Sequence, residues 1–146
     1  MKIDSINWNI LRLLQKNART SNAEIGRTVG ITSPAVSERI KKMEDVGLIL
    51  GYNTMVSPFE AQYQLKAIIT LRAFMGKLKP FLEKVTTYDE VLNCYRITGN
   101  ENIVMEVIIK NQKHLEKFID QLIVYGETKT QIVLSHVVAN NSIKSL

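Results

Sequence analysis

Apolar residues recur at helical spacing in the first third of the chain. Ile6, Ile10 and Leu14 repeat every four residues, which predicts a helix that packs against a core. Asp4 precedes them and is a favourable capping residue for that helix. A second, shorter helix is expected from position 21, where Ser-x-x-Glu forms a capping box, to the glycine at position 30.

The segment 33–46, SPAVSERIKKMEDV, predicts a third helix with one apolar and one polar face. Val36 and Met43 belong to its narrow apolar stripe, while serine, glutamate and basic residues lie on the other side. Ser33 is expected to cap this helix, and Pro34 to occupy its first position. Since only two residues separate it from the glycine before it, the second and third helices form a helix-turn-helix pattern.

The pattern changes to alternating apolar runs in the rest of the chain. Residues 48–56 are expected to form a wing and the start of a linker, because Ser57-Pro58 breaks that run. The predicted strands further on are 67–74, 91–98, 103–110 and 130–138, and the predicted helices are 78–87 and 113–124. This order predicts an α+β, ferredoxin-like β-α-β-β-α-β sandwich with both helices on one face of an antiparallel sheet.

Three regions follow from these elements. Residues 1–52 are predicted to form a winged helix-turn-helix DNA-binding domain, residues 53–65 a linker, and residues 66–146 a ferredoxin-like domain for dimerisation and effector binding. The boundary rests on the change of period and on the proline at position 58.

The uncovered sheet face is expected to be apolar. Alternation places one set of residues under the helices: Ile69, Leu71, Met105, Val107, Ile132 and Leu134. The opposite set is expected to point outward: Ile68, Phe74, Leu92, Cys94, Val104, Ile108, Val133 and Val137. Such a patch predicts a homodimer interface, with Arg96 opposite Glu106 as a cross-strand ion pair.

Composition fits an ordinary globular chain. Of 146 residues, 45% are hydrophobic and 23% are charged, and no apolar run approaches the roughly 18 residues of a membrane span. The start of the chain has no charged-then-apolar leader, so we expect a cytoplasmic protein. The single cysteine and two isolated histidines predict neither an internal disulfide nor a metal site, and no cofactor is expected.

Charge is concentrated at the N-terminal end. The first 52 residues hold eight Lys/Arg against five Asp/Glu, which accounts for +3 of the net charge of +5. This balance suits a nucleic-acid partner.

Several short motifs resemble the Lrp/AsnC, or feast/famine, family of transcription regulators, and the resemblance covers nearly the whole chain. They are Ile3-Asp4, Ile10-Leu11, Asn17-Ala18-Arg19, Ala23-Glu24-Ile25-Gly26, Val36-Ser37-Glu38-Arg39-Ile40 and Gly47-Leu48-Ile49. The resemblance implies a winged helix-turn-helix, a strand-like linker, and a domain that forms dimers, often tetramers or octamers, and often binds an amino acid. Asn7 stands where the family usually has aspartate, which should affect only helix packing or capping.

The third helix supplies the candidate DNA-binding residues. Its N-terminal half is expected in the major groove, where serine donates or accepts, glutamate accepts from cytosine, and lysine donates to guanine. The residues predicted near bases are Ser33, Pro34, Ser37, Glu38 and Lys41, and those predicted on phosphates are Arg27, Arg39 and Lys42. The alternative is a solvated helix face on which Glu38 and Arg39 form salt bridges.

A glycine turn later in the chain supplies the candidate effector-binding residues, Thr98, Gly99, Asn100, Glu101 and Asn102. By the resemblance it overlies the family's effector loop, in which glycine is usually followed by an acidic, an aromatic and another acidic residue. Here asparagines hold both acidic places and Glu101 holds the aromatic place. The alternative is a plain hairpin turn.

The sequence therefore favours a sequence-specific DNA-binding transcription regulator that acts as a homodimer or higher oligomer. Its expected partners are double-stranded DNA, other copies of itself, and an amino acid or other small effector. The alternative is an effector-independent, nucleoid-type architectural DNA binder. An enzyme resembling tetrapyrrole-modifying decarboxylases would need Arg72, Arg96 and His136 to converge, but alternation separates the arginines from the histidine, so no catalytic role is expected.

Overall fold

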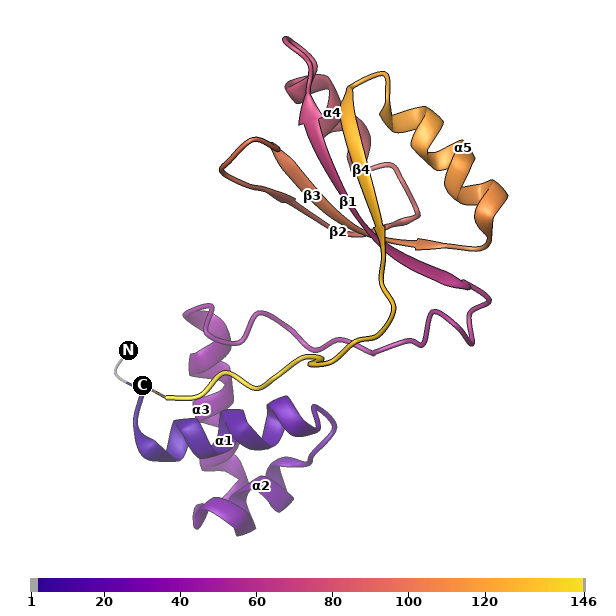
Figure 1. Ribbon diagram of the computed structural model, residues 1–146. Coiled ribbons are helices and arrows are strands. Elements are labelled where there is room, and N and C mark those ends of the chain that lie inside the picture. The colour runs from indigo at the N-terminus through magenta and orange to yellow at the C-terminus, as the bar shows by residue number, and fades with distance from the viewer. Residues whose placement is uncertain (1–2, 146) are drawn as a thin grey trace. The chain divides into compact units, whose positions relative to one another are not determined.

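The computed structural model describes residues 3–145, and the chain forms two compact units (Figure 1). The first contains the chain up to Met55 together with the segment from Val138 onward, and the second runs from Val56 to Val137. Within the described residues, none of the helices has the length and apolar character needed to cross a membrane.

Three helices build the first unit: α1 (Ser5–Lys16), α2 (Asn22–Val29) and α3 (Ser33–Asp45). Their inward stripes meet in one small core, which consists of Ile10, Leu11, Ile25, Val36 and Met43. The helix-turn-helix pattern is therefore confirmed, and periodicity placed its core correctly because each stripe is local to one helix.

The predicted N-terminal capping residue is confirmed for two of the three helices, α1 and α2. Asp4 and Ser21 cap α1 and α2 by accepting from backbone N–H groups, and Gly30 ends α2 in the left-handed conformation with φ 77°. The prediction that Ser33 caps α3 is wrong. Thr32 caps it instead, with an extended backbone and a hydroxyl that accepts from the backbone N–H of Ala35 at 3.4 Å.

Residues 48–56 do not form a wing of paired strands. The part of the chain that the structure describes contains no strand between α3 and residue 65. Leu48 and Ile49 instead fold back onto α3, where both backbone N–H groups donate to the carbonyl of Met43. Although this segment is rich in residues that favour strands, it pairs with no other strand among the described residues of the single copy.

The second unit follows the predicted order of elements. It consists of β1 (Leu65–Ala73), α4 (Leu78–Val85), β2 (Val91–Arg96), β3 (Ile103–Ile109), α5 (Gln112–Leu122) and β4 (Gly126–Ile132). The strands lie antiparallel in the order β2-β3-β1-β4. This arrangement confirms the ferredoxin-like sandwich.

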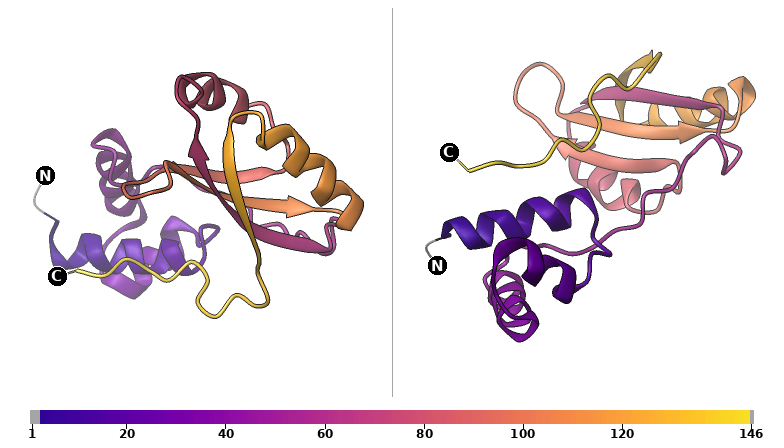
Figure 2. Two further views of the ribbon diagram at one scale, coloured as in Figure 1. Left: turned by 45° about the horizontal axis from the view of Figure 1, so that its top comes forward. Right: turned by 90° about the horizontal axis from the view of Figure 1, so that it is seen from below.

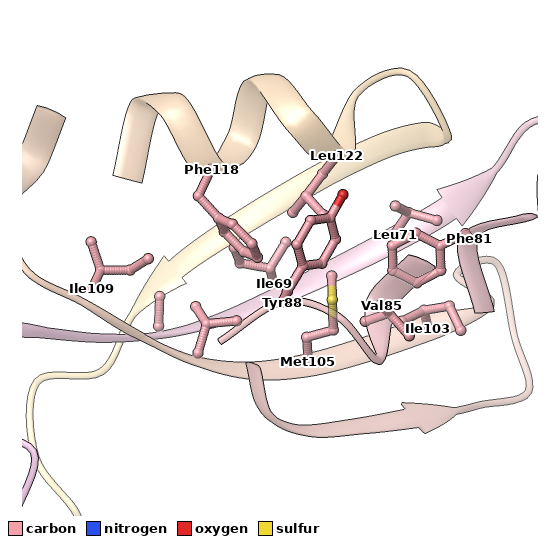
Figure 3. Packing of buried hydrophobic residues seen from close by; sticks show 12 residues of the cluster. Ile69, Leu71, Phe81, Val85, Tyr88, Ile103, Met105, Ile109, Phe118 and Leu122 are labelled. Atoms are coloured by element: carbon pink, nitrogen blue, oxygen red, sulfur yellow. The ribbon is translucent and has the colours of Figure 1, made fainter. Parts of the chain in front are cut away.

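Both helices pack on one face of this sheet. Figure 3 shows Phe118 and Leu122 of α5 reaching the strand residues Ile69 and Met105, which are fully buried. Phe81 and Val85 of α4 belong to the same core. The helix stripes and one set of alternating strand residues thus close the core, as the sequence predicts for β1 and β3.

A β-bulge reverses the predicted faces of β2 from Asn93 onward. The register shifts between Val91 and Asn93, so Cys94 pairs with Met105 on the core side. The predictions that Cys94 points outward and that Arg96 faces Glu106 are therefore wrong. Cys94 packs against the core, where burial raises the pKa of its thiol.

The last strand lies earlier in the chain than the prediction of 130–138. β4 ends at Ile132, and Leu134 is 97% exposed rather than packed under the helices. Ile132 lies opposite Ala67 on the core side but is 43% exposed at the end of the sheet. β4 is an edge strand with a polar sequence, so the apolar run beyond it was a misleading signal.

Candidate DNA-reading helix and effector loop

The outer face of α3 carries most of the candidate DNA-binding residues. Ser33, Ser37 and Lys41 are spaced by four, so they follow one another along one side of the helix. Pro34, Ser37, Glu38, Lys41 and Lys42 are exposed, and Ser33 and Arg39 are partly buried. Lys41 makes no ion pair with any residue from 3 to 145, so its charge is available to a ligand.

The turn before α3 depends on a close backbone approach at Gly26. A Cβ atom added there would lie 2.5 Å from the carbonyl oxygen of Ile31, nearer than side chains ever come. The same approach lets the backbone N–H groups of Gly30 and Ile31 donate to the Gly26 carbonyl. Arg27 and Ser33 line a shallow hollow over this turn. The structure thus brings the α2 candidate beside the start of α3.

Arg39 connects α3 to α1. Its Nη1 donates to Asp4 Oδ2 and to Asn7 Oδ1, both at 2.8 Å. Asn7 is 5% exposed, and its backbone N–H donates to Asp4. That N–H and the Arg39 guanidinium lower the pKa of Asp4. Asn7 therefore acts in helix packing, as expected, and Arg39 is in the interhelical salt bridge that the sequence left as an alternative.

Glu38 and Lys42 form an ion pair along α3, with Lys42 Nζ 2.6 Å from Glu38 Oε1. The pair has i,i+4 spacing, and both side chains are more than half exposed. The hydrogen bond from Lys42 holds the pKa of Glu38 below its usual range. Because the pair is exposed, water and salt weaken it, and either partner is accessible to DNA.

The loop at residues 98–102 closes a hairpin between β2 and β3 that projects from the sheet (Figures 1 and 2). The backbone N–H of Ile97 donates to the carbonyl of Asn102 at 2.9 Å. Asn102 also binds the end of β1, where its backbone N–H donates to Leu71 and its Oδ1 accepts from the N–H of Ala73. Asn102 therefore holds the loop in place, and its side-chain oxygen is already occupied.

A polar hollow of about 300 Å³ lies beside this loop. It is lined by Thr70, Arg72, Asn100, Glu101, Glu127, Thr128 and Lys129. Of the five predicted effector residues, Asn100 and Glu101 reach it, whereas Thr98 and Gly99 lie exposed outside its lining.

The charges of the hollow neutralise each other in pairs. Lys129 Nζ lies 2.8 Å from Glu101 Oε1, and Arg72 Nη2 lies 2.5 Å from Glu127 Oε2. The hydrogen bond from Lys129 lowers the pKa of Glu101. Each of the two pairs thus brings one carboxylate and one basic group to the lining of the hollow.

The open face of the sheet is less apolar than predicted. Ile68, Val104 and Ile108 lie on it by register, as expected, and Tyr95 joins them opposite Val104. Between them, Glu106 is ion-paired with Lys66 and accepts from Asn93 at 2.7 Å. These two hydrogen bonds lower the pKa of Glu106. Glu106 thus finds its partners on both neighbouring strands.

Sequence reasoning missed the partners of several site residues. Arg72, Glu127 and Lys129 line the loop hollow, although the sequence predicted effector-binding residues only in the glycine turn. The signal available was the predicted strand order, which places the last strand beside the first. Gly26 was noticed only within a family motif, and its chemical reason is the contact with Ile31.

Comparison with known proteins matches both units. The model of the AsnC-type helix-turn-helix domain matches residues 3–44, and that of the Lrp/AsnC ligand binding domain matches residues 66–143. The HTH-type transcriptional regulator LrpB of Bacillus subtilis is 32% identical over 139 residues, which are 94% of this chain and 92% of LrpB.

Two solved structures share the fold over nearly the whole chain. That of Bacillus subtilis LrpC has a TM-score of 0.90 at 27% identity and covers 94% of this chain and 99% of LrpC. The complex of transcriptional regulator NMB0573 of Neisseria meningitidis with L-Met has a TM-score of 0.91 and covers 97% and 96% of the two chains. At 22% identity, this second likeness shows the shared fold alone.

Proposed function

Because this chain belongs to the Lrp/AsnC family of transcription regulators, we propose that α3 is its DNA-reading helix. Ser33, Pro34, Ser37, Glu38 and Lys41 lie near base edges in the major groove. The observation that carries this assignment is the row of Ser33, Ser37 and Lys41 along α3, of which Ser37 and Lys41 are exposed, directly after the tight turn at Gly26. A helix positioned this way presents its N-terminal residues to bases.

Arg27 and Lys42 bind phosphates and set the register of the helix on the duplex. The sequence predicted that Arg39 binds a phosphate, but its two hydrogen bonds to α1 favour a structural role. We assign it to positioning, since it connects α3 to the helix on which it packs.

Two copies of the chain associate through the open face of the sheet. Tyr95, Ile68 and Val104 form its apolar centre, and Tyr95 is 56% exposed in the single copy. A dimer presents two α3 helices to two half-sites about one helical turn, or a multiple, apart. Light scattering at micromolar concentration tests this step, and a strictly monomeric protein contradicts it.

The loop hollow binds an amino acid or a similar small zwitterion. The domain matches a ligand-binding model, and the fold relative from Neisseria meningitidis was solved with L-Met. A thermal-shift screen of the twenty amino acids tests the proposal, since a ligand at 100 times its dissociation constant stabilises by about 2.7 kcal/mol. No shift with any of them contradicts it.

An effector-independent architectural DNA binder is the second candidate. It is favoured by the internal pairing of Glu101 with Lys129 and by the hydrogen bond of Asn102 to β1, which order the loop without a ligand. We propose no catalytic role. Arg72, which an enzyme of this fold would need, is paired with Glu127, and the relatives are transcription regulators.

The test of the proposed function is binding to the DNA upstream of the protein's own gene. A specific regulator in the cytoplasm should bind that DNA about 10³-fold or more tightly than a scrambled duplex at physiological salt. An architectural binder should bind both duplexes with similar affinity. Failure to bind either duplex contradicts both candidates.

A further inference from the structure

The C-terminal segment binds α1 through a single side chain. Gln15 Nε2 donates to the carbonyl of Ile143 at 3.1 Å, and Gln15 Oε1 accepts from the N–H of the same residue at 2.8 Å. One side-chain amide thus satisfies both backbone groups of one residue, as a neighbouring strand would. The two residues are separated by 128 positions in sequence.

An apolar groove lies beside this contact. It has a volume of about 360 Å³, and its lining includes Trp8, Leu11 and Leu14 of α1, Leu48 and Tyr52 of the segment after α3, and Ile143. The hydroxyl of Tyr52 donates to Glu44 Oε1 at 2.8 Å, which fixes this wall of the groove to the end of α3. Partial burial and this hydrogen bond raise the pKa of Tyr52 to about 12.

A second contact holds the same segment. Asn140 Nδ2 lies 3.6 Å from Met55 Sδ, and Asn140 adopts a left-handed backbone with φ 48°, which asparagine tolerates. Ile143 itself stays 75% exposed. Docking therefore depends on the hydrogen bonds of Gln15 more than on burial of the isoleucine.

The segment is the direct continuation of the strand beside the effector loop. β4 carries Glu127 and Lys129, which line the loop hollow, and the chain then runs from Ile132 to the contact at Ile143. The chain thus enters the first unit twice, once before Val56 and once after Val137. Figure 1 shows this segment in yellow, running beside α1.

We propose that residues 140–145 form a strap that docks in the groove of α1 and gives the DNA-binding unit a second link to the sheet unit. The groove lining contains none of the outward side chains of α3. The strap therefore leaves the DNA-reading face open and restricts the orientations of the unit that carries it. Its effect on DNA rests on the proposed function, whereas the docking itself does not.

The docking is tested without DNA by hydrogen exchange at the amide of Ile143. The hydrogen bond that the Ile143 N–H donates to Gln15 Oε1 should slow that exchange about tenfold relative to Gln15→Ala. Gln121→Ala is the matched control, because Gln121 is exposed on α5 and should leave the rate unchanged. Equal rates in the wild type and Gln15→Ala would overturn the proposal.

Trp8, the sole tryptophan, gives a second readout because it lines the groove. Truncation after Val137 should shift its emission to the red and increase quenching by acrylamide, and a peptide of residues 138–146 at millimolar concentration should reverse both changes. Unchanged emission after truncation would contradict docking. If docking holds and the chain binds DNA, the truncated chain should discriminate less between half-site spacings than the full chain, and unchanged discrimination refutes the orienting role alone.

Discussion

The two candidate sites of this protein treat charge in opposite ways. Lys41 on the outer face of α3 and Arg27 at the end of α2 are exposed and make no ion pair with any residue of the described range 3–145. In the loop hollow, Glu101 is paired with Lys129 and Arg72 with Glu127. The first site offers free charge to a polyanion, whereas the second must exchange partners before it binds anything charged.

This difference sets what each site can bind. Free basic groups attract phosphates over several ångströms and give binding that weakens steeply with salt. In the loop hollow, a simple ion must compete with the partner that its target group already has, and it gains one charged contact. A zwitterion can gain two, one with a carboxylate and one with a basic group. This difference supports the proposals that the α3 face binds a polyanion and that the loop hollow binds a small dipolar ligand.

Gly26→Ala should have the largest effect on stability and on DNA binding, and it should disturb the α3 face without affecting the loop hollow. The new Cβ would overlap the carbonyl of Ile31, so the turn before α3 must move. Overpacking of this kind costs about 1–3 kcal/mol, and we expect a lower melting temperature of the first unit together with loss of specific DNA binding. Calorimetry and a DNA shift assay measure both effects.

Ala23→Val is the control for that substitution, because Ala23 is exposed on the same helix. It should leave melting and DNA binding almost unchanged. If Gly26→Ala behaves like this control, the turn does not depend on the close approach.

Arg39→Ala should have the next largest effect. It removes a partner from Asn7, whose side chain is almost fully buried, and an orphaned polar group costs about 1–3 kcal/mol. Urea unfolding followed by circular dichroism measures the loss. Arg39→Lys keeps one charged donor and should recover part of it. A variant with full stability and weaker DNA binding would instead place Arg39 on phosphate.

Lys129→Ala should have the smallest effect and concerns only the second site. Without the lysine, the pKa of Glu101 should rise toward its ordinary value of 4.5, which a carboxyl NMR titration measures. Since the folded-state pKa is lowered, the stabilisation by this pair is present above pH 4.5 and is lost as the pH falls through the folded-state value. Melting at pH 7 should barely change, because the lysine is exposed. An unchanged pKa of Glu101 would show that the pair does not form in solution.

Local sequence signals predicted the helices of both units. They did not predict contacts between residues far apart in the sequence. Asp4, Ser21 and Gly30 act within one turn of their own helix, so their roles are readable from neighbouring residues. The contact of Asn7 with Arg39 spans 32 positions, and no sequence pattern predicts it.

Strands were harder to predict because pairing decides their faces. One extra residue near Leu92 turns Cys94 inward, and this bulge exists only in the register with β3. β4 was misplaced because its edge position tolerates the polar run from Gly126, whereas the apolar residues after Ile132 lie outside the sheet. The loop hollow could not be predicted for the same reason, since three of its charges come from β1 and β4.

The salt dependence of DNA binding by Arg27→Ala/Lys41→Ala tests the central claim most directly. Each lost phosphate contact should lower the slope of log affinity against log salt by about 0.9, and any contact that Lys41 makes to a base should appear as an extra loss on specific DNA. Lys77→Ala/Lys79→Ala removes two exposed charges from the sheet unit and should leave the slope unchanged. A lower slope for the first variant alone is the predicted result. A slope equal to that of the wild type would contradict the assignment of Arg27 to phosphate, and the absence of any extra loss on specific DNA would contradict the assignment of the α3 face to DNA.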